Sequence, residues 1–234
     1  MKTFDKNHVK NVVLLGHTGS GKTSLAETFL FHAGVISRKG SVEEGNTVAD
    51  YTDIEHEKGR TLFTKLMNVD WKGYKINVLD TPGSDDLSGE ILSAMKVADC
   101  GVMVLNAAMG VEVGSDMFWH YTEETKFPVL FVVNQIDHEK ADFEATVQQA
   151  KEHFGPQVVV VQYPLAQGEK GFDIIDVLHM CMYRYDGQGG TPEKLPIPEV
   201  TLDKAKQLHQ ELIETIATYD ESLMEKFFAE GTLS

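Results

Sequence analysis

The segment 16–23, GHTGSGKT, constrains this chain most, because it fits the pattern G-x-x-x-x-G-K-[ST] without a gap. The apolar run 9–15, VKNVVLL, precedes it and predicts a strand buried on both faces. A helix with one apolar face is expected over about residues 22–32. A glycine-rich turn between a strand and a helix binds phosphate through backbone N–H groups and the positive end of the helix.

This turn supplies a set of candidate nucleotide ligands. The residues expected to surround the phosphates are Gly16, His17, Thr18, Gly19, Ser20, Gly21, Lys22, Thr23 and Ser24. Lys22 is expected to reach the outer phosphates, and Thr23 to bind Mg²⁺. The alternative, a glycine-rich turn that binds nothing, is disfavoured because the strand and the helix both flank the motif.

The order of elements predicts the fold class. Apolar runs at 62–70, 74–79, 100–105 and 129–133 read as strands, and helices are expected at about 88–97, 114–125 and 142–154. The first two of these strands form a hairpin through the short link 71–73. Buried strands that alternate with amphipathic helices predict an α/β fold of the phosphate-loop NTPase type, a mostly parallel sheet with helices on both faces.

The remaining segments are less regular. Residues 36–60 are polar and show no clear period, so a long surface loop is expected there. After residue 156 we expect a strand at 158–161, which either joins the main sheet or opens an insertion. Loops are expected at 166–171 and 186–198, and an acidic helix at about 202–228, broken near Asp220.

A second phosphate-sensing motif follows the hairpin. In 80-DTPG-83, Asp80 is expected to approach Mg²⁺ through water, and the N–H of Gly83 to contact the terminal phosphate. Thr61 ends the long polar loop, and its hydroxyl is a third candidate for Mg²⁺. The alternatives are a Pro-Gly turn that opens a helix and an ordinary β-branched residue that starts a strand.

The run 134-NQID-137 follows a buried strand and resembles N-K-x-D, a guanine-reading motif. The Asp137 carboxylate can accept from the two adjacent N–H groups of guanine, which adenine lacks. Asn134 is expected to tie this loop to the phosphate loop, and Gln135 to stand where the usual lysine stacks. The alternative is that Asp137 caps a helix; its place after the carboxyl end of a strand favours a ligand site.

Composition limits the setting and the partners. The formal net charge is −15, which disfavours binding of nucleic acid over a broad surface and suits basic protein partners. The two cysteines, Cys100 and Cys181, form neither a disulfide framework nor a zinc motif, which fits a reducing, cytoplasmic setting. We find no apolar signal core and no apolar run near 18 residues, so neither secretion nor membrane spanning is expected.

These motifs together resemble translational GTPases, and most closely the elongation factor G family. Residues 50–62, DYTDIEHEKGRTL, are similar to that family's D-x-x-x-x-E-x-E-R-G-I-T-I loop. The likeness continues through WKGYKINVLDTPG and GVMVLNAAMGVEVGS, and resumes in LHQELIETIATYDESLMEKFF, which resembles the family's insertion subdomain. It implies a GTP-binding core over 1–156 and a small α+β insertion over 157–234, with the chain truncated before the last guanine-binding motif.

The resemblance also implies ligands and partners. The expected cofactors are GTP or GDP and Mg²⁺, the latter held by Thr23, Thr61 and Asp80. The expected partner is the ribosome, through large-subunit rRNA and stalk proteins, for a protein that is cytoplasmic and monomeric.

The chain departs from the family around the terminal phosphate. The family's catalytic histidine is Ser84 here, its two apolar gate residues are Thr18 and Arg60, and its phosphate-loop aspartate is Gly19. We therefore expect GTP hydrolysis to be slow or absent, with Ser84, Arg60 and Thr18 at the altered catalytic positions. The alternatives are a ribosome-activated GTPase in which Arg60 or the ribosome compensates, and a ribosomal-protection or release-factor-3-like GTPase. An ATP-using kinase and a scaffold that binds no nucleotide are weaker candidates.

Overall fold

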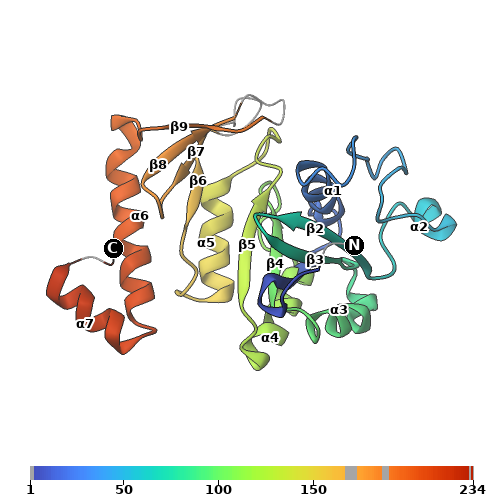
Figure 1. The fold of residues 1–234 in the computed structure, drawn as a ribbon, viewed down its shortest axis with the longest axis horizontal. Helices are drawn as coiled ribbons and strands as arrows, with labels where there is room; N and C mark the ends of the chain where they lie inside the picture. Colours follow the sequence, from blue (N-terminus) through green and yellow to red (C-terminus); the bar gives the residue numbers. More distant parts are fainter. Residues whose placement is uncertain (1–2, 167–172, 186–189, 232, 234) are drawn as a thin grey trace. The chain divides into compact units, whose positions relative to one another are not determined.

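The computed structural model describes residues 3–166, 173–185, 190–231 and 233, and the chain divides into two compact units. The first unit is Met1–Gln135, and the second is Ile136–Ser234. Figure 1 shows the elements of each unit in chain order. The predicted boundary at residue 156, between a core and an insertion, stays a prediction.

The first unit holds a five-stranded sheet and its helices. Its elements are the 3-10 turn η1 (Lys6–His8), β1 (Val9–Leu15), α1 (Lys22–His32), α2 (Asp53–Lys58), β2 (Lys65–Trp71), β3 (Tyr74–Asp80), the 3-10 turn η2 (Asp85–Leu87), α3 (Ser88–Met95), β4 (Cys100–Asn106), α4 (Val113–Thr125) and β5 (Val129–Asn134). The strand order is β2-β3-β1-β4-β5. Only β2 runs antiparallel, as the hairpin partner of β3, so the predicted mostly parallel α/β sheet is confirmed.

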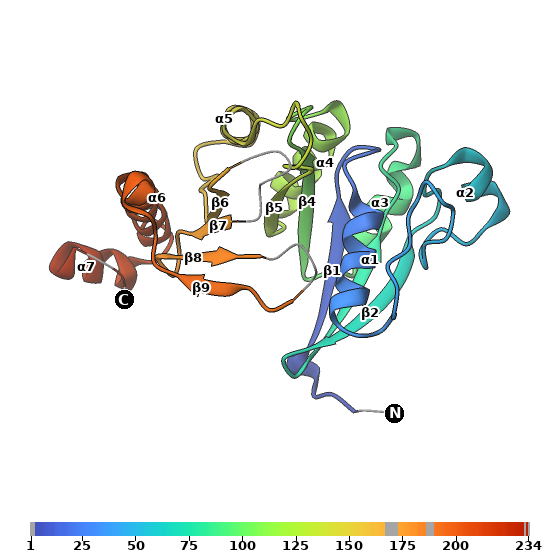
Figure 2. The ribbon, with the colours of Figure 1, turned by 90° about the horizontal axis from the view of Figure 1, so that it is seen from above.

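Alternate side chains of these strands form two apolar layers. Leu14, Val78 and Val104 pack with Ala26 and Leu30 of α1 on one face. On the other face, the ring of Phe131 lies against Trp119 of α4. Figure 2 shows α1 and α4 on opposite sides of the sheet. The pattern of near-continuous apolar strands follows from burial on both faces.

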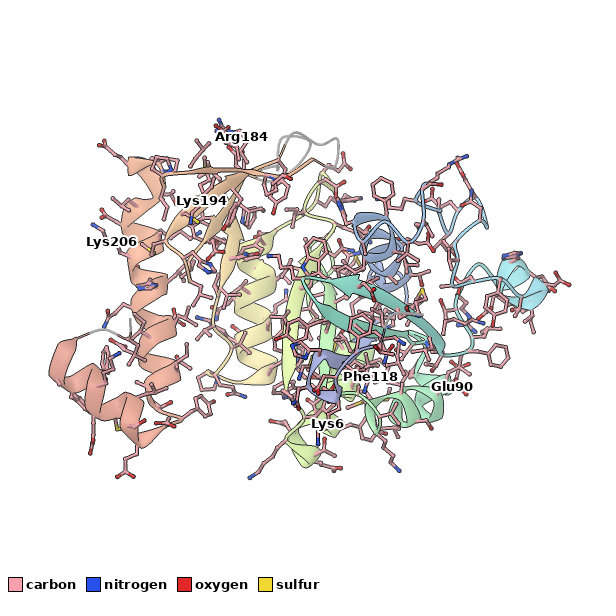
Figure 3. The ribbon with its side chains drawn as sticks, viewed as in Figure 1. Lys6, Glu90, Phe118, Arg184, Lys194 and Lys206 are labelled. Carbon is pink, nitrogen blue, oxygen red and sulfur yellow. The ribbon has the colours of Figure 1, made fainter. Side chains whose placement is uncertain are left out.

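Strand β2 begins at Lys65, three residues later than the predicted start of the strand at 62. The N–H groups of Leu62 and Phe63 donate to the carboxylate of Glu55, at 3.0 and 3.3 Å. The N–H of Thr64 donates to the carboxylate of Glu90 at 2.9 Å. Figure 3 labels Glu90, which projects from α3. Because side chains take these donors, the three residues do not join the sheet ladder.

The prediction that residues 36–60 form only a loop was wrong at one point, because α2 lies inside this segment. Thr52 caps the helix by accepting from the N–H of Glu55, and its hydroxyl also donates to the Glu55 carboxylate at 2.6 Å. Gly59 ends the helix with φ of 60°, in the left-handed region. A helix of six residues is too short to show a hydrophobic period.

The second unit contains an antiparallel sheet and three helices. Its elements are α5 (Phe143–Phe154), β6 (Gln162–Pro164), β7 (Asp173–Asp176), β8 (Cys181–Arg184), β9 (Glu193–Leu195), α6 (Glu199–Ala217) and α7 (Glu221–Glu230). The sheet order is β6-β7-β8-β9. Asp220 caps α7 by accepting from the N–H of Leu223, so the predicted helix break near this residue is confirmed.

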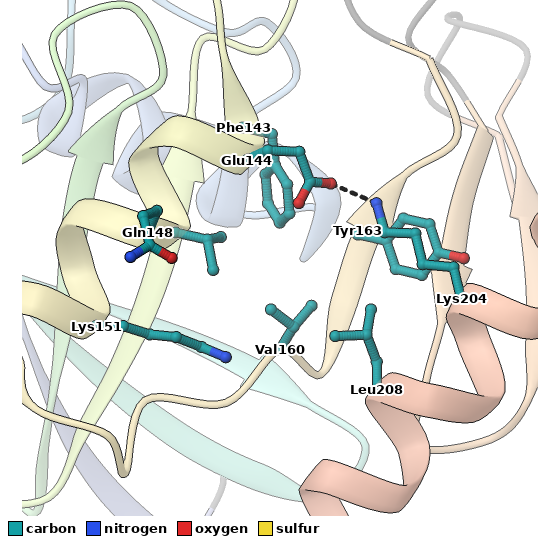
Figure 4. A pocket seen from close by; sticks show the side chains of 9 residues that line it. Phe143, Glu144, Gln148, Lys151, Val160, Tyr163, Lys204 and Leu208 are labelled. Atoms are coloured by element: carbon teal, nitrogen blue, oxygen red, sulfur yellow. Dashed lines mark hydrogen bonds and ion pairs between the residues drawn. The ribbon is translucent and has the colours of Figure 1, made fainter.

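Two predictions in this unit were wrong. Residues 158–161 form no strand, and β6 begins at Gln162 instead. Val160 lines a cleft of about 140 Å³ between α5, β6 and α6, beside Tyr163 and Leu208 (Figure 4). The run 158–161 is thus at most half-buried, and Val160 packs toward side chains of α5 and α6 without forming part of a strand.

The second error lies in the predicted loop at 186–198, which contains β9. Residues 167–171 and 186–189 of the two predicted loops lie outside the described residues. In the part of the chain that the structure describes, no helix has both the length and the apolar character needed to cross a bilayer.

Candidate functional site

The phosphate loop lies between β1 and α1, as predicted from its motif. Gly21 stands at the first turn of α1 with φ of 93°, and no side chain caps the helix. The N–H groups of this turn are therefore available to a ligand, in the manner of helix N-termini that bind anions. A Cβ at Gly21 would lie 2.3 Å from Nδ2 of Asn134, so only glycine fits here.

Lys22 is buried in this loop, and its ammonium group faces carbonyl groups of the loop backbone. Its ammonium group donates to the carbonyl oxygens of Gly16, at 2.8 Å, and His17, at 3.1 Å. Burial lowers the pKa of Lys22 to about 8, while the carboxylates of Asp80 and Glu112 oppose the shift. A buried amine that has no direct bond to a carboxylate is stabilised in its charged form by an anion such as phosphate.

Three residues from separate segments meet at the start of α1. The hydroxyl of Thr23 donates to Oδ2 of Asp80 at 2.7 Å, and its oxygen lies 3.1 Å from that of Thr61. All three side chains are buried. The loop 36–60 thus ends on the phosphate-loop helix, where β3 also ends.

The oxygen atoms of this cluster fit Mg²⁺. Oδ1 of Asp80 is buried without a hydrogen-bond partner. Burial raises the pKa of Asp80 to about 6, although the bond from Thr23 and the charge of Lys22 lower it. A divalent cation relieves this cost, since Mg²⁺ takes hard oxygen ligands from one or two carboxylates and completes its shell with water and phosphate. The described residues include no group of three or more His, Cys, Asp or Glu side chains arranged to hold a metal ion.

Asp50 is a candidate ligand that sequence reasoning missed. Its side chain is buried, and its Oδ1 also lacks a partner. Burial raises the pKa of Asp50, and a hydrogen bond from the Thr61 side chain opposes this. In the sequence, Asp50 stands out only as the first residue of the segment 50–62. Its candidate role as a ligand becomes visible through its contact with Thr61 in the structure.

The altered residues lie together beside Gly83. A Cβ on Gly83 would stand 2.5 Å from both Nζ of Lys22 and the backbone N of Thr18, so this glycine lies against the phosphate loop. The next residue, Ser84, is buried, and its Oγ accepts a hydrogen bond from Nη1 of Arg60 at 2.9 Å. Thr18 is exposed.

Two buried glutamates hold the loop 36–60, and sequence reasoning missed both. Glu27 of α1 is fully buried and accepts from the N–H groups of Gly40, at 3.0 Å, and Val48, at 2.5 Å. Glu55 of α2 pairs with Lys65 of β2 at 2.9 Å, and both side chains are buried. The T-x-x-E spacing of residues 52–55 could have revealed the cap of α2, whereas no local signal marks Glu27.

The base-reading loop contacts the phosphate loop through two amides. Nδ2 of Asn134 donates to the carbonyl of Ser20 at 2.9 Å, and Nε2 of Gln135 donates to that of Gly19 at 3.0 Å. Gln135 takes a left-handed φ of 59° and accepts from Asn106 at 2.9 Å. Asp137 follows in the second unit with an exposed side chain, and its guanine-reading role stays a prediction.

Two loop residues of the predicted set remain, His17 and Ser24, and neither has a hydrogen bond to Thr23, Thr61 or Asp80 among the described contacts. Nε2 of His17 lies 3.7 Å from the Glu112 carboxylate, and its Nδ1 is buried without a partner. Ser24 is exposed on α1.

A mostly parallel sheet with a phosphate loop after its first strand, and an aspartate at the end of the neighbouring strand, defines a phosphate-loop nucleotide-binding domain. The family model of the elongation factor Tu GTP binding domain matches residues 7–228. The chain belongs to this family and is a translational GTPase domain of the elongation factor G-like kind.

Individual relatives agree with the family match. The chain is 33% identical to elongation factor G of Mycoplasma pneumoniae over 224 residues, which is 95% of this chain and 33% of that protein. It is 32% identical to an elongation factor G-like protein of Thermotoga maritima over 220 residues, 94% of this chain and 31% of that protein. A crystal structure of a Thermus thermophilus protein aligns with a TM-score of 0.88 and 33% identity, over 97% of this chain and 34% of that one. The chain spans about a third of the length of these relatives.

Proposed function

We propose that this chain is the GTP-binding domain of a translation factor that acts on the ribosome in a translocation-type step. It binds GTP or GDP together with Mg²⁺. It hydrolyses GTP slowly or not at all. The observation that carries the proposal is a contrast within one site. The groups suited to phosphate and metal, including Lys22, Thr23 and Asp80, are assembled. The position that aligns water in the family holds Ser84, bonded to Arg60.

The binding half of the proposal rests on chemistry at both ends of the nucleotide. The buried ammonium of Lys22 and the unpartnered oxygen of Asp80 both gain from a magnesium–phosphate complex. Asp137 offers a carboxylate to the paired N–H groups of guanine, and adenine would leave that charge without a donor pair. We therefore expect GDP to bind more tightly than ADP.

The hydrolysis half rests on how phosphoryl transfer is catalysed. Positioning and charge stabilisation supply almost all the acceleration, so the loss of a group that aligns water can cost several orders of magnitude. The Ser84 side chain is short and already accepts a bond from Arg60. The exposed Thr18 replaces an apolar gate and leaves water less restricted.

A ribosome-activated GTPase of ordinary rate is the second candidate, and the place of Arg60 favours it. A guanidinium beside Gly83 can stabilise charge on the transferred phosphoryl group, as arginine fingers do. The ribosome is the partner in both candidates, and both describe a cytoplasmic, monomeric protein.

One experiment separates these candidates. Single-turnover cleavage of GTP is measured with and without ribosomes, for the natural protein that carries this chain and for its Ser84→His variant. Slow cleavage that rises many-fold in the variant supports the proposal, and fast cleavage that is unchanged or lower in the variant rejects it. Ser93→His, the same replacement at an exposed site on α3, is the matched control. A failure to bind guanine nucleotide would reject both candidates.

A further inference from the structure

The segment around Arg60 is fixed on both sides. Its N–H donates to the carbonyl of Glu55 at 3.3 Å, so it closes the last turn after α2. The next residue, Thr61, contacts Thr23 through their hydroxyl groups. Figure 1 shows α2 and the segment that leads from it to β2. The backbone of Arg60 is therefore held next to the cluster of Thr23, Thr61 and Asp80.

The guanidinium of Arg60 carries donors that none of the described residues accepts. A guanidinium has five N–H donors, and one of them goes to the neutral Oγ of Ser84. Among the described residues, no carboxylate lies within ion-pair distance of Arg60, although the chain carries a net charge of −15. The side chain is half-buried, so its positive charge is partly shielded from water.

The bond to Ser84 places this charge at the phosphate end of the site. Ser84 follows Gly83, whose Cα lies against Nζ of Lys22 and the backbone N of Thr18. Arg60 thus contacts Ser84, and Lys22 lies against the neighbouring Gly83. A tetrahedral anion between them would meet one cation from the phosphate loop and one from the loop 36–60.

From these contacts we infer that Arg60 binds the terminal phosphate of the triphosphate, so that the site prefers GTP to GDP before any cleavage. This inference rests on the proposed function and names a residue that determines its nucleotide preference. Ser84 acts as a positioning residue, because its hydroxyl holds the guanidinium in place. The Ser84 hydroxyl thus positions the guanidinium of Arg60, a role that a histidine at the same position would not have.

The charge on the terminal phosphate is the physical source of the preference. A guanidinium forms charge-assisted hydrogen bonds to phosphate oxygens, often in pairs. GDP has no group at this place and leaves Arg60 bonded only to Ser84. Hydrogen bonds to charged groups make a difference of about tenfold to a hundredfold in affinity.

The test compares dissociation constants for two ligands in Mg²⁺, GDP and a GTP analogue whose outer bridging oxygen is replaced by NH. Arg60→Ala is expected to bind the analogue about tenfold to a hundredfold more weakly, with less than about twofold change for GDP. Arg60→Lys keeps the charge without the planar fork and should fall between the two. Ser84→Ala should weaken the analogue selectively, by less than Arg60→Ala.

Arg38→Ala is the matched control, because Arg38 lies in the same loop, is exposed and carries the same charge. It should leave both constants unchanged. Equal losses for both ligands in Arg60→Ala, or no loss at all, would overturn the inference and leave the proposed function standing. If the unmodified chain binds neither ligand, the proposed function fails with it. Thermal unfolding of each variant without nucleotide separates these results from a loss of fold.

Discussion

The hydroxyl oxygen of Thr61 lies 3.1 Å from that of Thr23, above the carboxylate that ends β3. This contact joins the end of the loop 36–60 to the first turn of α1. Both hydroxyls and the carboxylate of Asp80 are thereby gathered at one point. A cation bound there would touch the loop and the core at once, so the order of the loop and the binding of Mg²⁺ are coupled.

Replacement of Thr61 by alanine should uncouple the loop from the metal. We expect the affinity for a non-hydrolysable GTP analogue in Mg²⁺ to fall by about tenfold, with little change for GDP, because one ligand of the metal is lost. Titration of Mg²⁺ at fixed nucleotide should show that the variant needs a higher Mg²⁺ concentration for half-maximal binding. Thr64→Ala, in the same segment, is the control, because it removes a hydroxyl whose one hydrogen bond among the described residues goes to the carbonyl of Glu90. Equal losses in both variants would contradict the coupling.

The depressed pKa of Lys22 predicts a pH dependence of nucleotide binding. With its pKa lowered to about 8, the free site holds a mostly neutral amine above that pH. Phosphate favours the charged amine, so binding above pH 8 must take up a proton. The affinity for GDP should be level below pH 8 and fall above it, by up to about tenfold per pH unit.

Calorimetry in two buffers of different ionisation enthalpy measures this proton uptake directly. The side chain in Lys22→Arg keeps its charge at every pH used. The affinity of this variant for GDP, although lower, should therefore not fall above pH 8. The comparison also removes the titration of the nucleotide itself. Parallel pH profiles for the two proteins would show that the amine is already charged in the free site.

Glu27 should hold the loop 36–60 without any ligand. Its two oxygens accept from the N–H groups of Gly40 and Val48, which are far from it in sequence. Glu27→Ala leaves these donors without partners, at a cost of about 1–3 kcal/mol for each buried group. Hydrogen exchange should rise across the loop and stay slow in β1 and β4. Glu44→Ala, at an exposed carboxylate of the same loop, should change neither region.

These residues show what sequence can and cannot reveal. The phosphate loop and the sheet were predictable, because a contiguous motif and continuous apolar runs report local structure. The helix α2 was missed because its stability comes from Glu55 and its contacts to β2. The role of Glu27 was invisible for the same reason, since its partners lie 13 and 21 residues away. The run 158–161 misled because β-branched residues favour strands, whereas here they are at most half-buried and Val160 faces a cleft between α5, β6 and α6.

The ion pair of Glu55 and Lys65 predicts how acid acts on the first unit. Burial alone would raise the pKa of Glu55, but bonds from Thr52, the backbone of Leu62 and Lys65 outweigh it and lower the pKa to about 2. The ordinary value is 4.5. As the pH falls, Glu55 is therefore protonated in the unfolded chain before it is protonated in the folded chain. The stability that Glu55 contributes is complete above about pH 4.5 and is lost as the pH falls toward 2.

Three variants test this pair through the free energy of unfolding between about pH 3 and pH 7. Glu55→Gln should flatten the acid side of the profile, because the titrating group is gone. Lys65→Met should cost about 3–5 kcal/mol at neutral pH, since it leaves a buried carboxylate without its cation. The double variant should recover part of that loss, as neither charge then remains. An acid profile of Glu55→Gln that matches the unmodified chain would show that Glu55 does not titrate with folding.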